Sequence, residues 1–263
     1  METVKLIIDR KPVEVPKGTT ILDAAKGMGI RIPTLCYMKL EDLHYENNPG
    51  ACRICVVEIE GRRNLAPSCK TECMEGMVVQ THSPRVMNAR KTVMELILSN
   101  HPAECLTCSS NGHCELQAIA HDLGIREIRY KGEMSTFQID RSPSIVRNMN
   151  KCIMCRRCET MCNEVQKVGA LSAVGRGFDA VVMPAFESPL LETAAYIAAS
   201  ALPSAQLAPS FRRMPPGMSS TPSPILKKSS SYRPRHPSAS PLANHSAWKP
   251  APSRQAKWSP HCA

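Results

Sequence analysis

The sequence predicts an α+β fold class, in which a β-rich segment precedes a mostly helical segment, a cysteine-rich segment and a disordered tail. Three observations lead to this order. Short runs of β-branched residues fill residues 1–80, a helical pattern with clear start signals opens residues 81–135, and four closely spaced cysteines lie within residues 136–194. Residues 195–263 are rich in Pro, Ser and Ala without periodicity, which indicates disorder.

Four short hydrophobic runs predict strands in the β-rich segment. They lie at residues 4–8, 13–15, 56–59 and 77–79. Between the second and third runs, Thr19 or Thr20 can cap a helix that we expect to run to about Met28, with Gly29 at its C-terminal end. One short helix among several strands predicts a small, sheet-based domain.

The helical segment opens with Ser83 as N-cap and Pro84 as the first helical residue. Six side chains fall mostly on one face of the predicted helix, which indicates a buried stripe. They are Val86, Arg90, Val93, Met94, Ile97 and Leu98. We expect this helix to stop near Asn100 and a shorter one, residues 115–123, to end at Gly124.

The run Cys-x2-Cys-x2-Cys-x3-Cys is the most informative motif of the chain. Its members are Cys152, Cys155, Cys158 and Cys162. This is the ligand spacing of a bacterial-type [4Fe–4S] site, in which the first three thiolates hold one cluster and the fourth normally serves a second. Zinc sites use two separated Cys-x2-Cys pairs, so the run favours iron and sulfide over zinc. We expect a short helix after it.

A second group of ligand-type residues follows the first long helix. Its members are His101, Cys105, Cys108 and Cys114. A histidine at a helix end is usually a capping or packing residue, but three closely spaced cysteines follow this one. One imidazole and three thiolates suit a [4Fe–4S] cluster or a zinc ion, so the group alone leaves both open.

A third group lies in the β-rich segment and comprises Cys36, Cys52, Cys55 and Cys69. Four thiolates on a sheet-based scaffold suit a [2Fe–2S] cluster. Gly50 precedes the close pair, so we expect backbone N–H groups to approach the sulfurs there. Cys73 is a fifth cysteine nearby, and zinc held by Cys52, Cys55, Cys69 and Cys73 is the main rival interpretation.

Composition narrows the function classes. The chain has 13 Cys and no signal-peptide pattern, which favours a cytoplasmic protein with metal-bound cysteines over a disulfide scaffold. We expect no transmembrane segment. Nine of the 33 Lys and Arg but none of the 23 Asp and Glu lie in residues 200–263, so most of the net charge of +10 belongs to the tail. We therefore expect no nucleic-acid partner, and no nucleotide-binding motif is visible.

Taken together, the three groups resemble the N-terminal electron-relay region of [FeFe]-hydrogenases, most closely the catalytic subunits of NADH- or NADP-linked complexes. The segments at residues 98–102, 114–117 and 162–166 strengthen the resemblance, which covers residues 3–194. The large iron–sulfur subunit of complex I and some formate dehydrogenases share this region. The resemblance implies a β-grasp [2Fe–2S] domain, a one-His/three-Cys [4Fe–4S] module and a two-cluster ferredoxin domain.

The chain departs from this family after residue 194, where a second four-cysteine run is expected. Alanines occupy its 3-3-4 steps, at Ala195, Ala198, Ala201 and Ala205. Every Ala codon is GCN, and a frame one base earlier reads NGC, which can encode cysteine. We therefore hypothesise a single-base loss near codon 195. The alternative is a natural Ala/Pro/Ser linker, and Cys262 is an improbable substitute ligand.

The sequence thus predicts an electron-transfer fragment of an oxidoreductase, with one secure [2Fe–2S] site, one secure [4Fe–4S] site and a second, incomplete [4Fe–4S] site. The resemblance implies a flavin-containing, NAD(P)H-oxidising partner subunit and small iron–sulfur subunits. The chain alone is not expected to be catalytic. A complex I-like or formate dehydrogenase fragment is the alternative parent, and a zinc-binding interaction protein is the alternative of another class.

Overall fold

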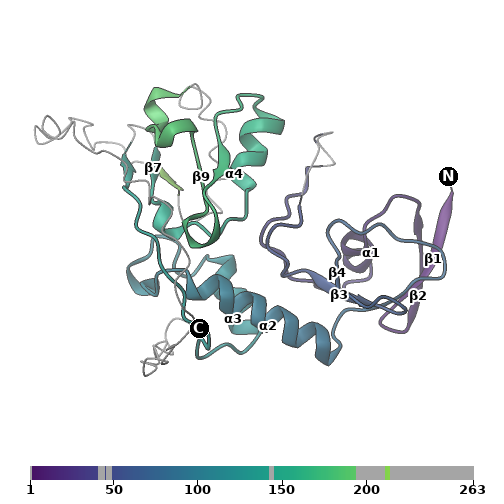
Figure 1. Cartoon of the computed structure of the whole chain (residues 1–263). Coiled ribbons are helices and arrows are strands. Elements are labelled where there is room, and N and C mark those ends of the chain that lie inside the picture. The colour runs from purple at the N-terminus through teal and green to yellow at the C-terminus, as the bar shows by residue number, and fades with distance from the viewer. Residues whose placement is uncertain (1, 41–44, 46–48, 142–144, 194–210, 214–263) are drawn as a thin grey trace, which may run out of the picture.

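The computed structural model describes residues 2–40, 45, 49–141, 145–193 and 211–213. In Figure 1 a β-sheet lobe with α1 lies at one side and a lobe with β7, β9 and α4 lies at the other. The helices α2 and α3 run along one side of the molecule and connect these lobes. Strands and helices are mixed along the chain, so the predicted α+β class is confirmed.

The N-terminal lobe contains a five-stranded mixed sheet in the order β2-β1-β5-β3-β4. Its strands are β1 (Thr3–Ile8), β2 (Lys11–Pro16), β3 (Val56–Ile59), β4 (Ala66–Pro67) and β5 (Val78–Gln80). β1 pairs in parallel with β5, and the other pairs are antiparallel. The four predicted strands are confirmed, whereas the two-residue β4 is too short to leave a periodic signal in the sequence.

Helix α1 (Ile21–Gly27) begins where the sequence predicts. The Thr20 hydroxyl accepts a hydrogen bond from the Asp23 N–H at 3.2 Å, and Gly29 follows with a φ of +76°. Four residues of α1 are buried in the core of this lobe, namely Ile21, Leu22, Ala24 and Ala25. The helix therefore closes the core of the N-terminal lobe.

Helix α2 (Pro84–Ser99) is capped by Ser83, whose hydroxyl accepts from the Val86 N–H at 3.3 Å. The buried residues of α2 are Val86, Arg90, Met94, Glu95 and Leu98. After the short 3₁₀ helix η2 (Cys105–Thr107), helix α3 (Glu115–Asp122) ends just before Gly124, as predicted. Glu95 was not expected on the buried face; its carboxylate pairs with Arg129 at 2.7 Å.

The segment around the four-cysteine run consists of short elements. They are β6 (Asp140–Arg141), β7 (Ile145–Arg147), η3 (Met149–Lys151), α4 (Arg157–Thr160), the π-helix η4 (Met161–Val165), β8 (Ser172–Val174), η5 (Gly177–Asp179), β9 (Val181–Met183), η6 (Ala185–Glu187) and η7 (Leu190–Glu192). One expectation needs correction, because the helix begins inside the cysteine run and not after it. The x3 spacing between Cys158 and Cys162 spans about one helical turn, so both can lie on one side of a helix.

Within the predicted tail, residues 195–263, the structure describes only β10 (Phe211–Arg213), which pairs antiparallel with β7. For these three residues the expectation of disorder is wrong, since a strand edge at β7 provides backbone partners for them. The rest of the predicted tail, with its alanine steps and Cys262, lies outside the described residues.

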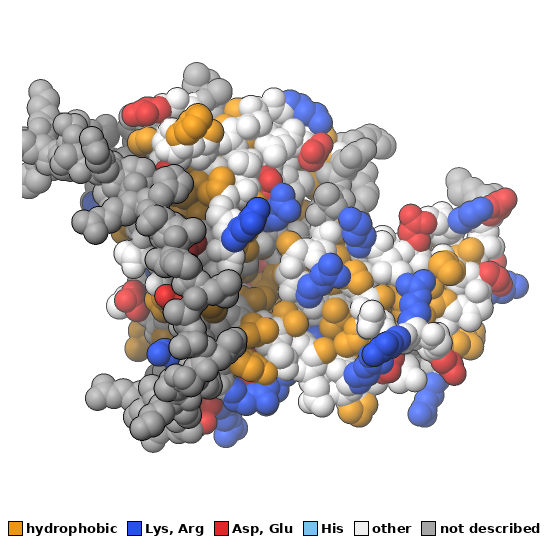
Figure 2. Space-filling model, viewed as in Figure 1, with side chains coloured by type: hydrophobic (Ala, Val, Ile, Leu, Met, Phe, Trp, Pro, Cys, Tyr) orange, Lys and Arg blue, Asp and Glu red, His pale blue; other side chains and the backbone are white. Residues whose placement is uncertain are grey.

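On the face shown in Figure 2, Lys and Arg side chains are spread over both lobes and lie among Asp and Glu side chains. Of the helices in the described ranges, none combines the length and the apolar character that a bilayer-spanning helix needs.

Candidate metal centres

The four cysteines of the N-terminal group come together at one place. The Sγ atoms of Cys55 and Cys69 lie 3.3 Å apart, and the thiols of Cys52 and Cys69 form hydrogen bonds to Cys36. These cysteines come from the chain after α1, the loop before β3 and the chain after β4. The fold therefore brings four buried cysteines together from separate segments of the sequence.

The electrostatics of this group favour partial ionisation. Hydrogen bonds from Cys52 and then Cys69 hold the pKa of Cys36 well below its usual range, and the hydrogen bond with Cys69 lowers the pKa of Cys55 to about 6. The same contacts raise the pKa of Cys52 and Cys69. Thiolates are the form of cysteine that ligates metal, so ionisation within this group suits metal binding.

A backbone amide also reaches this group. The Gly50 N–H donates to the Cys36 Sγ at 3.3 Å, and Gly50 has a φ of +114°. An amide that points at a sulfur stabilises negative charge there and tunes the potential of a bound cluster. The expectation that the glycine-containing loop would supply backbone donors is confirmed.

Cys73 differs from the four neighbouring cysteines. It is buried, and its backbone N–H donates to the Thr19 carbonyl at 2.9 Å. Burial and then the charge of Asp23 raise the pKa of Cys73, whereas the four grouped cysteines shift one another. Cys73 packs in the same hydrophobic core as α1, Cys55 and Cys69, but no hydrogen bond between its thiol and these sulfurs is found in the described residues.

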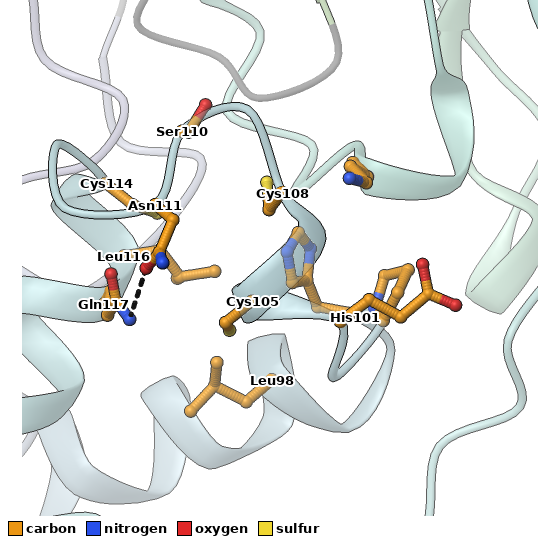
Figure 3. A pocket seen from close by; sticks show the side chains of 12 residues that line it. Leu98, His101, Cys105, Cys108, Ser110, Asn111, Cys114, Leu116 and Gln117 are labelled. Atoms are coloured by element: carbon orange, nitrogen blue, oxygen red, sulfur yellow. Dashed lines mark hydrogen bonds between the residues drawn. The ribbon is translucent and has the colours of Figure 1, made fainter. Parts of the chain in front are cut away.

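The second group lines one cavity. Figure 3 shows His101, Cys105, Cys108 and Cys114 around it, with Leu98 and Leu116 among the other lining residues. The Nδ1 atom of His101 is buried and, within the described residues, has no hydrogen-bond partner. Burial, assisted by the charge of Lys151, lowers the pKa of His101 to about 4. A neutral imidazole with an unused buried nitrogen beside three cysteines fits a metal or cluster ligand.

The four cysteines of the third group lie on a tightly turned loop and on α4 and η4. Met154 and Arg156 both have positive φ angles, 53° and 59°, which bend the loop between Cys152 and Cys158. The Met154 N–H donates to the Cys152 Sγ at 3.4 Å, and the Ala170 N–H donates to the Cys162 Sγ at 3.3 Å. Backbone donors thus reach both ends of the run.

The first three cysteines of the run interact electrostatically. Burial raises the pKa of Cys158 to about 12, with negative charge on Cys155 and Cys152 contributing to the rise. Burial also raises the pKa of Cys155. Three neighbouring thiols at this spacing fit one face of a cubane, as the sequence predicts.

Across the described ranges, no three His, Cys, Asp or Glu side chains are grouped as a single metal ion would require. A cluster distributes its ligands over two or four iron atoms, so these ligands need not converge on one point. When bound, such clusters accept and release single electrons.

Two charged residues near these sites were missed in the sequence. Lys151 lines the cavity of His101, and Arg157 is buried at 5 % exposure between two cysteines of the run. A lysine or arginine in a cysteine run gives no sequence signal of burial, because these residue types are mostly exposed.

Three protein families match successive parts of the chain. Residues 1–84 match a 2Fe-2S iron-sulfur cluster binding domain, and residues 90–129 match an NADH-ubiquinone oxidoreductase-G iron-sulfur binding region. Residues 142–194 match the ferredoxin-like domain of NADH-quinone oxidoreductase subunit 3. Together they cover most of the residues before the predicted tail.

Two individual proteins are similar to most of this chain. The NADP-reducing hydrogenase subunit HndD of Solidesulfovibrio fructosivorans is 59 % identical over 194 residues, which is 73 % of this chain but 33 % of that protein. A G-type subunit of the NADH-quinone oxidoreductase of Rhizobium meliloti is 42 % identical over 68 % of this chain and 21 % of its own length.

A solved structure, of an NAD+-reducing [NiFe]-hydrogenase, has a TM-score of 0.72 at 27 % identity and covers 83 % of this chain and 90 % of its own. The chain thus spans a third or less of the two sequence relatives. These relatives are subunits by name. The chain is thus similar to an N-terminal iron–sulfur region of the HndD and NADH oxidoreductase G type, with domains that bind [2Fe–2S] and [4Fe–4S] clusters.

Proposed function

We propose that this chain relays electrons between a nicotinamide-linked flavin partner and a catalytic centre that lies outside it. The observation that carries the proposal is one shared hydrophobic core. Cys36 and Cys52 of the first group belong to it, and Cys114 of the second and Cys155 of the third pack against it. One shared core places the three groups next to one another, as an electron relay requires.

Twelve side chains are the proposed cluster ligands. Cys36, Cys52, Cys55 and Cys69 hold the [2Fe–2S] cluster; His101, Cys105, Cys108 and Cys114 hold one [4Fe–4S] cluster; Cys152, Cys155, Cys158 and Cys162 serve the incomplete site. The sulfur contacts of the first group, the orphaned nitrogen of His101 and the backbone donors to Cys152 and Cys162 support this assignment.

The proposed domains follow these ligand groups. They are a β-grasp domain at residues 1–80, a helical one-His/three-Cys module at residues 81–135, a partial two-cluster ferredoxin domain at residues 136–194 and a tail at residues 195–263. The five-stranded sheet with α1 supports the first, α2 and α3 support the second, and the matched ranges 1–84, 90–129 and 142–194 support the division.

The third site is proposed to bind at most one labile cluster. In a two-cluster ferredoxin the last cysteine of each run ligates the other run's cluster, so Cys152, Cys155 and Cys158 need a fourth ligand from a second run. That run is absent from the sequence, where alanines stand at the expected steps. The third family match ends at residue 194, which is consistent with a frame change near codon 195. The nucleotide sequence tests this, because restoring one base must open a longer frame with cysteines.

The proposed parent is a cytoplasmic hydrogenase complex of the [FeFe] type, with a flavin-containing NAD(P)H-oxidising subunit and small iron–sulfur subunits as partners. The 59 % identity to the hydrogenase subunit exceeds the 42 % to the NADH-quinone oxidoreductase relative, which favours a hydrogenase over a complex I-like parent. We propose no nucleic-acid partner and no catalysis by this chain alone.

The test is anaerobic purification of the whole chain, followed by assays of iron, acid-labile sulfide and zinc. The proposal expects brown protein with roughly six irons from the two complete clusters. It also expects signals of both cluster types in electron paramagnetic resonance after reduction. Colourless, zinc-loaded protein would instead establish the zinc-binding alternative.

A further inference from the structure

The side chain of Arg157 contacts all three cluster-ligand segments. Its Nη1 donates to the Glu115 Oε2 at 2.9 Å, and its Nη2 donates to the Tyr37 carbonyl oxygen at 3.0 Å. Each partner directly follows a proposed ligand, because Tyr37 follows Cys36 and Glu115 follows Cys114. Arg157 itself directly precedes Cys158. One arginine side chain therefore connects residues that stand next to a proposed ligand of each group.

Burial of Arg157 and further contacts of its partners hold this junction in place. Arg157 is buried, and Glu115 is the first residue of α3. Tyr37 is anchored on its other side, since its hydroxyl donates to the Asp23 carboxylate of α1 at 3.2 Å. A planar guanidinium with two directed donors fixes both partners relative to itself, which the point charge of a lysine does not do.

Given the proposed electron-relay function, we infer that Arg157 is a positioning residue that sets the spacing between the three cluster sites. Its guanidinium donates hydrogen bonds to Glu115 and Tyr37, which are neighbours of proposed ligands, and it carries no electron. Its role is to hold the chain beside Cys36 and the start of α3 at fixed places against the third segment. Loss of the two guanidinium hydrogen bonds leaves each cluster intact. It separates neighbouring cluster sites or changes their relative orientation.

The neighbouring Arg156 offers a matched control. It lies in the same run and has the same charge, but its side chain is half exposed and forms its ion pair with Glu159 of α4, three residues further along the chain. Replacement of Arg156 therefore removes an arginine from this loop without disturbing the junction. Any effect of Arg157 that Arg156 lacks comes from the three-segment contact.

The experiment compares the anaerobically purified whole chain with Arg157→Gln, Arg157→Lys and Arg156→Gln. The readout is the magnetic interaction between the reduced [2Fe–2S] cluster and the one-His/three-Cys cluster, measured by electron paramagnetic resonance. This pair is chosen because it does not need the incomplete third site. We expect wild-type iron and sulfide in each variant, loss of the interaction in Arg157→Gln and Arg157→Lys, and an unchanged interaction in Arg156→Gln.

An unchanged magnetic interaction in both Arg157 variants overturns the inference. A wild-type interaction in Arg157→Lys alone also overturns it, because the positive charge and not the two directed hydrogen bonds would then be what matters. If Arg157→Gln does not fold, Arg157→Lys decides. A wild-type chain without iron and sulfide refutes the proposed function separately. Amide hydrogen exchange of the cluster-free chain then tests Arg157: faster exchange near Tyr37 and at the start of α3 in Arg157→Gln alone supports it, and unchanged exchange overturns it.

Discussion

The first and third ligand groups bring their cysteines together in different ways. The cysteines of the first group come from well-separated segments, yet the folded sheet and α1 bring Cys55 and Cys69 to 3.3 Å and surround them with core residues. The cysteines of the third group lie within eleven residues on one turned loop and a short helix. All four of its cysteines lie close together in the sequence. A complete set of cluster ligands nevertheless needs a further cysteine from later in the chain.

This difference shows that compact spacing in sequence and completeness of a site are separate properties. The run from Cys152 to Cys162 brings its cysteines together within a short segment through local backbone turns. The first group depends on strand pairing, because β3 and β4 set the distance between Cys55 and Cys69. The third group is thus the easiest to detect in the sequence, yet it is the group for which the chain lacks a ligand.

The largest expected effect is loss of the first cluster in Cys69→Ala. Cys69 contacts both Cys55 and Cys36, so its removal deprives the group of one proposed ligand and of the hydrogen bonds that favour thiolates. We expect the [2Fe–2S] signal to vanish and the iron content to fall by about two atoms per chain. Iron analysis and electron paramagnetic resonance of the reduced protein measure both changes.

The matched control is Cys73→Ala, which removes a buried cysteine a few residues further along the chain. Because the pKa of Cys73 responds to burial and Asp23, and not to the grouped cysteines, we expect this variant to keep its [2Fe–2S] signal. Loss of the bound metal in Cys73→Ala as well as in Cys69→Ala would contradict the assignment and favour the ligand set of the zinc interpretation, which contains both residues.

The next effect separates two cysteines of the third group. Cys155 shares charge interactions with Cys152 and Cys158, so Cys155→Ser should abolish the labile third cluster. Cys162 is proposed to serve a cluster for which the chain lacks the other ligands, so Cys162→Ser should leave the third-site signal in place. Equal loss in both variants would mean that Cys162 completes a single cluster in this chain. The measurement is sulfide content and the reduced spectrum.

Much of the fold could be predicted from the sequence, since its signals are local. Thr20 and Ser83 cap α1 and α2 as expected, and the strand runs match β1, β2 and β3. What could not be predicted depends on tertiary contacts. Burial of Arg157 requires partners 42 and 120 residues away in the chain, and the pairing of β10 with β7 joins residues in a segment of disorder-like composition.

The candidate sites show the same division. Spacing alone identified the third group and left zinc open for the other two groups. Only the fold shows that Cys36 joins Cys52, Cys55 and Cys69 while Cys73 faces the charge of Asp23. Likewise, the orphaned Nδ1 of His101 depends on a cavity that no sequence pattern describes.

A moderate effect on stability tests how the first site is braced. Arg90 of α2 is buried and donates from Nε and Nη2 to the Val56 carbonyl of β3, at 3.2 and 2.8 Å. Arg90→Met removes both hydrogen bonds beside the Cys55 segment, and we expect the free energy of unfolding of the cluster-free chain to fall by about 1–3 kcal/mol. Denaturant titration measures this change.

For comparison, Lys91→Met removes the same charge from the adjacent, partly exposed position. Surface substitutions of this kind change stability by about 0.5 kcal/mol or less. If Arg90→Met were as mild as Lys91→Met, the contact between α2 and β3 would not brace the first site, and the contrast with the third group would lose this support.

The smallest expected effect is a pH dependence at the junction of β3 and α2. The Ser83 hydroxyl and then the Arg85 guanidinium hold the pKa of the Glu58 carboxyl below its usual range. Because the folded pKa lies below the unfolded value of about 4.3, the contribution of Glu58 is fully present above that pH and is lost as the pH falls through the folded pKa. We expect Glu58→Gln to lower stability slightly at neutral pH and to flatten the acid limb of the stability curve of the cluster-free chain. Glu60→Gln, at the exposed residue directly after this strand, is the control and should leave that limb unchanged. A parallel decline of both variants and the wild type with acid would show that Glu58 does not link the sheet of the first site to α2.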